Sequence, residues 1–268
     1  MFDNLAKISF SPAEKTGFIT LGMASLLSFI YPALAAIPLF LFLLLCFAAP
    51  FFPGFSFFLP IISRGPAGME SIALTFDDGP SPSSTPILLD LLDRHSLQAT
   101  FFVVGEKAAK YPELITEMIA RGHTLGNHSW SHDYFLMLRR QNNLRKDIHK
   151  TQENLKELGI QPLVFRPPAG ITNPRLGKVL TGEGLITVTY SCRALDRGNR
   201  NIRNLSGKIL EHLQPGDIVM LHDLAPHQKK QLGYWQKELD HLFRTLTLDY
   251  NPVPLEQLIR QPVMRLVN

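Results

Sequence analysis

The sequence predicts an α/β fold in which a parallel sheet is preceded by a long uncharged N-terminal stretch. After Arg64, short apolar runs of about four to six residues alternate about seven times with amphipathic segments. This alternation is typical of a parallel sheet, either open or closed into a barrel. Polar residues also follow the apolar runs at Asp77-Asp78, His128 and His222. In closed α/β barrels this strand-end rim is where functional sites are built.

The N-terminal stretch is the first element along the chain. Residues 16–63 contain no Asp, Glu, Lys, Arg or His over 48 residues, and all nine histidines lie beyond them. A transmembrane helix needs about 20 mostly apolar residues. Two candidate spans are therefore Gly17–Ile30 and Ile37–Phe52. We expect residues 1–15 to form an N-terminal tail and residues 16–63 a membrane anchor of one or two transmembrane helices.

The topology of this anchor stays open at the level of sequence. Pro32 and Pro38 interrupt the apolar run and could turn a helical hairpin. A hairpin favours the cytoplasmic side for both ends, whereas a single span favours an extracytoplasmic catalytic domain. A cleaved signal peptide is an alternative, because Ala33-Leu34-Ala35 has the spacing of a cleavage site. The Phe-rich segment Phe51–Ile62 predicts an interfacial segment at the membrane surface.

Residues 64–268 are expected to form the catalytic domain, and its elements follow from their periodicity. Strands are expected at Ile72–Phe76, Ala99–Val104, His123–Gly126, Leu163–Phe165, Ile186–Tyr190, Ile218–Leu221 and Asn251–Val253. Helices are expected at Pro86–His95, Glu113–Arg121, Leu144–Leu158, Tyr234–Leu246 and Pro254–Arg260. Gly122 and Gly159 end two of these helices.

Composition excludes several classes of protein. An apolar content of 45% with a net charge of +4 excludes a disordered chain. Lys and Arg are scattered along the sequence, so no nucleic-acid partner is expected. Cys46 lies in the apolar stretch and Cys192 in the charged part, and we predict no disulfide between them.

The first chemical motif is Thr75-Phe-Asp-Asp-Gly-Pro80. Adjacent carboxylates at Asp77 and Asp78 repel one another unless a cation or a shared proton relieves them. Gly79-Pro80 would turn the chain so that both face one cleft. An ordinary turn with solvated acids is the alternative.

The second motif contains His128 and His132. Histidines four residues apart on a helical turn present two imidazoles to one metal ion. With one carboxylate they make three protein ligands and leave room for a water, which is the catalytic arrangement for zinc. Iron or cobalt would suit the same set. Packed or surface histidines are the alternative.

Three further features are individually weak. Arg166 opens the loop Arg166-Pro-Pro-Ala-Gly170 and could meet a strand-end carboxylate, although a simple proline-rich loop explains it too. Asp196 could be a solvated loop residue, and His222 a packed histidine after a strand. Their common placement after predicted strands is what indicates one site.

The ordered set of motifs resembles the polysaccharide deacetylase family, also called the NodB-homology or carbohydrate esterase family 4 domain. The resemblance covers about residues 70–260. Thr75–Pro80 matches the first family motif, His128–His132 the second, Arg166–Gly170 the third and Ile218–His222 the fifth.

Two departures from the family pattern concern the substrate pocket. Ala169 stands where the family usually has Tyr, so the backbone N–H would be kept but the pocket wall altered. In the fourth motif, usually D-x-x-D-W, Arg193 replaces the first acid, Asp196 is the second, and Arg197 replaces the Trp.

The resemblance implies a distorted (β/α) barrel of about seven strands and a bound divalent metal. Asp78, His128 and His132 would hold the metal, most commonly Zn²⁺, with Co²⁺, Fe²⁺, Mn²⁺ and Ni²⁺ as alternatives.

The resemblance also implies catalytic roles. Asp77 would be the general base, Arg166 would set the charge state of Asp77, and His222 would be the general acid. Asp196 would orient His222, and the backbone at Pro168 and Ala169 would contact the oxyanion or the substrate.

The implied reaction is hydrolysis of N-acetyl groups on amino sugars of a cell-envelope polysaccharide, such as peptidoglycan or poly-N-acetylglucosamine. A deacetylase or deformylase of a lipid-linked amino sugar is the alternative, motivated by the Phe-rich segment Phe51–Ile62. A non-catalytic glycan-binding module is a third hypothesis, which the intact motifs disfavour. The other expected partner is the bilayer that would hold the anchor.

Overall fold

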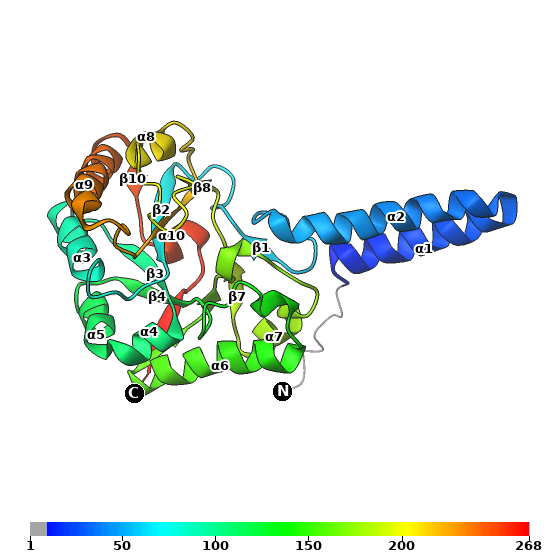
Figure 1. The fold of residues 1–268 in the computed structure, drawn as a ribbon, viewed down its shortest axis with the longest axis horizontal. Coiled ribbons are helices and arrows are strands. Elements are labelled where there is room, and N and C mark those ends of the chain that lie inside the picture. Colours follow the sequence, from blue (N-terminus) through cyan, green and yellow to red (C-terminus); the bar gives the residue numbers. More distant parts are fainter. Residues whose placement is uncertain (1–9, 268) are drawn as a thin grey trace.

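The computed structural model describes residues 10–267 and has two parts, a helical hairpin and an α/β domain from which the hairpin projects (Figure 1). Of the N-terminal tail expected over residues 1–15, residues 1–9 lie outside the described part.

The hairpin consists of α1 (Pro12–Ile30) and α2 (Pro32–Ala48), joined by the single residue Tyr31. Helix α1 begins before the expected span because Ser11 and Glu14 form a capping box around Pro12. Pro32 begins α2, so a turn lies at the first of the two prolines, whereas Pro38 lies inside α2 and does not interrupt it. The short 3₁₀ helix η1 (Ala49–Phe51) continues α2.

Most large apolar side chains of the hairpin are exposed. Phe29 is 88% exposed and Phe47 72%, an arrangement that is costly in water over so large a surface. Within residues 10–267, one helical segment, Pro32–Phe51, is long and apolar enough to cross a membrane. That criterion of length and composition is also met by a signal sequence near an N-terminus.

The Phe-rich segment divides between the two parts of the molecule. Phe51 and Phe52 are exposed, whereas Phe57 and Leu59 are buried. The strand β1 (Ile61–Ile62) then joins the domain's sheet. Phe57 packs with Ala13 and Ala49 of the hairpin, and Leu59 packs in a core cluster of the domain. The interfacial interpretation is therefore wrong for Phe57, Leu59 and β1, because these residues pack against the rest of the protein.

The α/β domain is built on one parallel sheet with the strand order β1-β7-β6-β4-β3-β2-β9-β8, and β10 pairs alongside β2. The order leaves β1 and β8 at opposite ends, so the described strands form an open barrel. The predicted α/β fold with a parallel sheet is confirmed. The strands beyond β1 are β2 (Ser71–Asp77), β3 (Ala99–Val103), β4 (Thr124–Asn127), β6 (Val164–Phe165), β7 (Ile186–Val188), β8 (Cys192–Arg193), β9 (Ile218–His222) and β10 (Asn251–Pro252).

Helices lie around the sheet (Figure 1). Two further strands form a separate antiparallel sheet. The pair is β5 (Ile160–Pro162) with β11 (Met264–Leu266). The helices are α3 (Thr85–Arg94), α4 (Gly105–Lys110), α5 (Pro112–Ala120), α6 (Gln141–Glu157), α7 (Leu176–Gly182), α8 (Leu205–Leu210), α9 (Leu232–Asp249) and α10 (Leu255–Ile259), with 3₁₀ turns η2 (Leu136–Leu138), η3 (Pro168–Gly170) and η4 (Lys229–Gln231).

The largest core cluster packs the sheet against the surrounding helices. Phe76 of β2 and Phe101 of β3 stack with ring centroids 5.0 Å apart, and Phe243 of α9 meets Phe76 edge-on. Every residue of β2 is buried, as expected for a central parallel strand covered on both faces. This packing fixes where β2 ends.

The strand register brings the polar residues together. In the ladder between β2 and β9, Asp77 and His222 are register partners at the last position of each strand. The carboxyl end of β4 lies two strands from β2, so His128 follows at the same edge of the sheet.

Candidate metal and catalytic site

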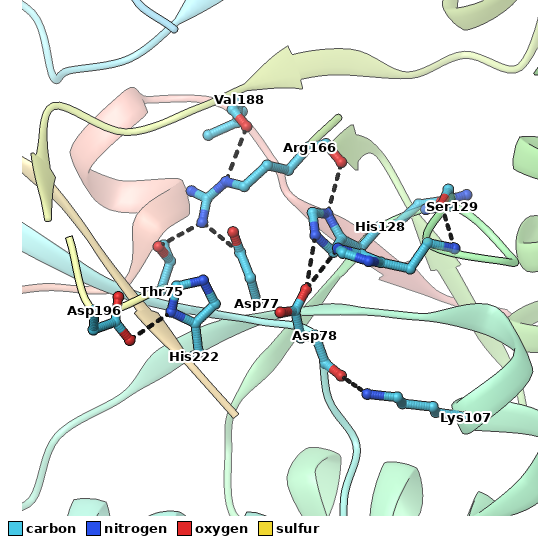
Figure 2. Close-up of polar contacts among 12 residues, drawn as sticks. Thr75, Asp77, Asp78, Lys107, His128, Ser129, Arg166, Val188, Asp196 and His222 are labelled. Atoms are coloured by element: carbon cyan, nitrogen blue, oxygen red, sulfur yellow. Dashed lines mark hydrogen bonds and ion pairs between the residues drawn. The ribbon is translucent and has the colours of Figure 1, made fainter. Parts of the chain in front are cut away.

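Most of the predicted site residues line one cleft of about 930 Å³ at the carboxyl ends of the strands, whereas Arg166 and Pro168 do not line it. The close-up of this edge shows two groups of polar side chains, one around Asp78 and one around Asp77 and His222 (Figure 2). The predicted residues that line the cleft are Asp77, Asp78, His128, His132, Ala169, Asp196 and His222.

Asp78, His128 and His132 form a group that could hold a metal ion, with one donor atom from each within 4.8 Å of the others. Oδ1 of Asp78 lies 2.8 Å from Nε2 of His132 and 3.3 Å from Nε2 of His128. Burial on its own raises the pKa of Asp78, but hydrogen bonds and charge interactions with the two histidines outweigh it and hold the pKa well below its usual range.

The hydrogen bond of His128 to the backbone indicates that these residues fit a cation. Nδ1 of His128 lies 2.7 Å from the backbone carbonyl of Arg166, and only a protonated Nδ1 can donate to that oxygen. With Nδ1 protonated, Nε2 donates to the Asp78 carboxylate only in the imidazolium form, whereas in the neutral ring it presents a lone pair toward that carboxylate. A cation among the three donors converts this repulsion into coordination, and the carbonyl contact orients the ring as in many metal sites.

The His128–His132 motif lies in a loop, so its placement on a helical turn is wrong. Ser129 and His132 both have positive φ angles, of 68° and 49°. Asp147 of α6 shapes the loop by accepting the Trp130 N–H at 2.6 Å and the Ser131 hydroxyl at 2.7 Å. The two histidine rings reach a centroid separation of 5.0 Å through this loop geometry.

Lys107 of α4 is a supporting residue that the sequence did not reveal. Its Nζ donates to the backbone carbonyl of Asp78 at 2.6 Å (Figure 2). Asp78 has a φ of 73°, a left-handed conformation that costs a non-glycine residue about 1 kcal/mol or more. Lys107 therefore helps to hold a strained backbone that aims the carboxylate at the histidines.

Asp77 points away from this group and pairs with Arg166. Nη1 of Arg166 donates to Oδ1 of Asp77 at 2.7 Å and to Thr75 Oγ1 at 2.8 Å. The guanidinium is fully buried and also donates to the carbonyls of Val188 and Thr189. Burial lowers the pKa of Arg166, while the charge of Asp77 opposes that shift. The predicted contact between Arg166 and a strand-end carboxylate is thus present.

His222 and Asp196 form a second buried pair. Nδ1 of His222 lies 2.8 Å from Oδ2 of Asp196, and Asp196 is 2% exposed, which excludes the solvated alternative. Burial lowers the pKa of His222, but the hydrogen bond and the charge of Asp196 outweigh this effect. The pKa of His222 is therefore raised to about 9. The same oxygen of Asp196 accepts the N–H of Asn199 at 3.0 Å.

The loop after Arg166 places a backbone donor at the cleft. Ala169 lies on the cleft wall with a φ of 56°, and its N–H has no acceptor among residues 10–267. Pro168, predicted with it as a contact to oxyanion or substrate, is buried and does not line the cleft. Of the two, Ala169 is the residue that the structure exposes to a substrate.

Asp223 is a further buried acid next to the site. Its position directly after His222 is the only sequence feature that points to it. It accepts the hydroxyls of Ser84 and Thr85 at 2.6 and 2.5 Å, and burial raises its pKa to about 6. These contacts fix the chain that follows Asp78. Asp223 does not line the cleft, so its part is structural.

The comparisons with known proteins agree with this geometry. A family model described as polysaccharide deacetylase matches residues 64–187. The peptidoglycan-N-acetylglucosamine deacetylase of Bacillus cereus is 32% identical over 197 residues, which cover 73% of this chain and 91% of that relative. The enzyme PgdA of Listeria monocytogenes, with the same description, is 38% identical over 156 residues, 58% of this chain and 33% of that relative.

A solved structure extends the agreement to the fold. The crystal structure of the Bc1960 peptidoglycan N-acetylglucosamine deacetylase superposes with a TM-score of 0.69 at 30% identity, covering 76% of this chain and 95% of that one. The two relatives named above are described as deacetylases, which hydrolyse amide bonds. With the sheet, the motifs and these relatives in agreement, the chain belongs to the polysaccharide deacetylase family and is a hydrolase.

Proposed function

We propose that this protein is a membrane-anchored, divalent-metal-dependent deacetylase that removes N-acetyl groups from a cell-wall glycan of the peptidoglycan type. The observation that carries the proposal is the convergence of Asp78, His128 and His132 beside the pairs Asp77–Arg166 and Asp196–His222 in one cleft. The relatives named as peptidoglycan deacetylases support the substrate class.

Asp78, His128 and His132 would hold the metal, and zinc is our first choice because three protein ligands of this kind are common at catalytic zinc. When bound, the cation supplies Lewis-acid polarisation of the acyl oxygen and lowers the pKa of the attacking water. The side chains of the chain itself then carry the protons and position the substrate.

Asp77 is placed to take the proton from the attacking water. Arg166 holds one carboxylate oxygen at 2.7 Å, which leaves the other free to accept that proton. The N–H of Ala169 donates to the acyl oxygen as negative charge develops there; removing one such donor typically costs about 100- to 1000-fold in rate.

His222 protonates the leaving amine as the carbon–nitrogen bond breaks. An amine leaves poorly unless it gains a proton, and Asp196 keeps the imidazolium available at neutral pH by raising the pKa of His222 to about 9. The products are a free amino sugar and acetate.

The exposed apolar hairpin supports the proposed membrane anchor, and the cleft lies near the base of this hairpin. Pro53 follows η1 by two residues, and its carbonyl accepts the Thr189 hydroxyl at 2.7 Å. A Cβ on Gly170 would lie 3.3 Å from the Pro53 ring, and Gly170 lines the cleft. The anchor therefore meets the domain beside the loop that carries Ala169.

A lipid-linked amino sugar is the second candidate substrate. The observation that favours it is this same contact, because a cleft beside the base of a membrane hairpin is close to the headgroup region of the bilayer.

Acyl release from a panel of substrates tests both candidates. The full chain, loaded with Zn²⁺, is incubated with peptidoglycan, soluble chitooligosaccharides and a polyprenyl-phosphate-linked N-acetyl amino sugar, and acetate is quantified together with bound metal. Release from the glycans supports the first candidate, and release from the lipid-linked sugar alone supports the second. No release from any member by metal-loaded protein would refute the deacetylase proposal.

A further inference from the structure

We propose that the cleft contains a cationic subsite for a phosphoryl group of the substrate, formed by Arg193, Arg197, Arg200 and Lys208. This inference rests on the proposed function, because it assigns the substrate class of the same cleft. We refer to the four residues as the cationic cluster. All four line the cleft that also holds the candidate metal and acid–base residues.

The carboxylates of the cleft have cationic or histidine partners, whereas the cations of the cluster have no carboxylate partner among residues 10–267. The three carboxylates are already engaged: Asp77 by Arg166, Asp196 by His222, and Asp78 by the two histidines. Within residues 10–267, no carboxylate oxygen pairs with any member of the cationic cluster. Like charges gathered at a concave surface focus a positive potential into it and attract an anion.

Two members of the cluster, Arg197 and Arg200, lie in a well-fixed loop between β8, which carries Arg193, and α8, which carries Lys208. Leu195, Arg197 and Asn199 all have positive φ angles, between 54° and 59°. A loop holds several such residues only when its surroundings determine it, and such strain gathers at functional sites.

The contacts that determine this loop also connect it to the catalytic pair. The Asn199 side chain donates to the carbonyls of His222 at 3.0 Å and Leu224 at 2.6 Å, and the Asn199 N–H donates to Asp196. The side chains of Arg197 and Arg200 therefore start from a backbone fixed to the general acid.

The remaining polar contacts of the cluster orient it and leave donors free. Arg193 donates one N–H to the hydroxyl of Tyr190 at 2.8 Å, and Nε of Arg200 donates to Nε2 of His227 at 3.1 Å. Each guanidinium retains further N–H groups. Planar arginine forks match the tetrahedral oxygens of a phosphoryl group, and several cations together suit its charge better than that of a single carboxylate.

The cluster also extends toward the membrane hairpin. Tyr190, which Arg193 contacts, lies beside Gly170, and Gly170 lies against Pro53 at the base of the hairpin. A phosphoryl group in the cluster would thus be near the headgroup region of the bilayer. Two sources of that group are the phosphate of a lipid-linked sugar and the phosphate of a soluble sugar.

Direct binding tests the subsite independently of turnover. Metal-loaded full chain is titrated in a calorimeter with N-acetylglucosamine 1-phosphate and with neutral methyl N-acetylglucosaminide. We expect the phosphorylated sugar to bind about tenfold or more tightly, and the advantage to shrink as salt screens the charges. In the double variant Arg197→Ala/Arg200→Ala the advantage should fall about tenfold. Arg244→Ala, an exposed arginine on α9, is the matched control and should keep it.

Three results would overturn the subsite. Equal affinity for the two sugars would remove the preference for phosphate. An advantage retained in the double variant would place the phosphoryl group elsewhere, for example on the metal. Tighter binding of N-acetylmuramic acid than of the phosphorylated sugar would assign the cluster to a carboxylate.

Acetate release in the same preparations separates this inference from the proposed function. Turnover of neutral chitooligosaccharide without a phosphate advantage in binding leaves the deacetylase proposal standing and refutes the subsite. A phosphate advantage in binding without acetate release from any substrate refutes the deacetylase proposal and supports the subsite.

Two further substrate arms identify the source of the phosphoryl group. The reconstituted full chain is given N-acetylglucosamine 1-phosphate in solution or its polyprenyl-linked counterpart in phosphatidylcholine vesicles. Faster release in vesicles assigns the subsite to a lipid-linked sugar, and equal rates assign it to soluble phosphorylated sugars.

Discussion

The carboxylates on the two sides of the cleft are neutralised by different kinds of partner. On the metal side, Asp78 faces two histidines whose nitrogens converge on one oxygen, and the set is stable only with a cation or added protons. On the acid–base side, Asp77 and Asp196 each have one dedicated cationic partner, Arg166 or His222. The Asp78 side would thus be balanced by a cation or by protons on its histidines, whereas each carboxylate on the other side already has a cationic partner within the protein.

The comparison is tested most strongly by removing a metal ligand. In His128→Ala we expect loss of stoichiometric Zn²⁺ and of activity to background, because two ligands hold the ion far more weakly than three. Elemental analysis and acetate release measure both effects. His241→Ala, an exposed histidine on α9, is the control and should retain metal and rate. Full metal content in the His128 variant would contradict the ligand assignment.

Removing the base should separate chemistry from metal binding. Asp77→Asn keeps the shape of the side chain but cannot take a proton, so we expect acetate release to fall about 1000-fold, or about 4 kcal/mol of transition-state stabilisation. Bound metal should stay stoichiometric, since Asp77 points to Arg166. Asp249→Asn at the end of α9 is the control. A near-normal rate in Asp77→Asn would move the base elsewhere.

The positions of Asp77, Asp78 and Arg166 could be predicted from the sequence, because they depend on short motifs and on strand periodicity. Asp77 and Asp78 end a fully buried strand, so their place at the rim follows from strand periodicity alone. The pairing of Arg166 with Asp77 was implied by the family resemblance, and the buried guanidinium confirms the contact.

What the sequence could not supply depends on contacts between distant segments. The loop of His128–His132 is shaped by Asp147 on α6, and Lys107 on α4 donates to the Asp78 carbonyl, 29 residues earlier in the chain. Ile61 and Ile62 join the sheet by pairing with β7, more than 120 residues later in the chain. Local periodicity carries no information on such contacts.

We expect the His222–Asp196 pair to make activity depend on pH. In the proposed mechanism His222 acts in its protonated form. The pKa of His222 is raised to about 9, so activity should be present below that pH and be lost as the pH rises through it. Asp196→Asn removes the charge that raises this pKa. The basic limb of the rate profile should therefore move to lower pH, with about a tenfold loss of kcat at neutral pH.

A pH–rate profile of each variant with constant metal content checks this result. In His222→Ala the limb should disappear altogether together with most of the activity. If Asp196→Asn leaves the limb where it is in the parent protein, the titration belongs to another group and the pairing has no catalytic part.

The smallest effect is expected at Lys107, which acts on the metal side through the backbone. Its Nζ donates to the carbonyl of Asp78, whose left-handed conformation aims the carboxylate at the histidines. Supporting residues of this kind typically change metal affinity by about 10- to 100-fold. We expect Lys107→Met to weaken Zn²⁺ binding about tenfold in a competition titration with a chelator, while excess Zn²⁺ restores most of the rate. Lys110→Met on the same helix, an exposed residue, should bind Zn²⁺ like the parent protein. Unchanged affinity in Lys107→Met would show that β2 and the histidines alone orient Asp78, and the metal side would then need less support from the fold than the acid–base side does.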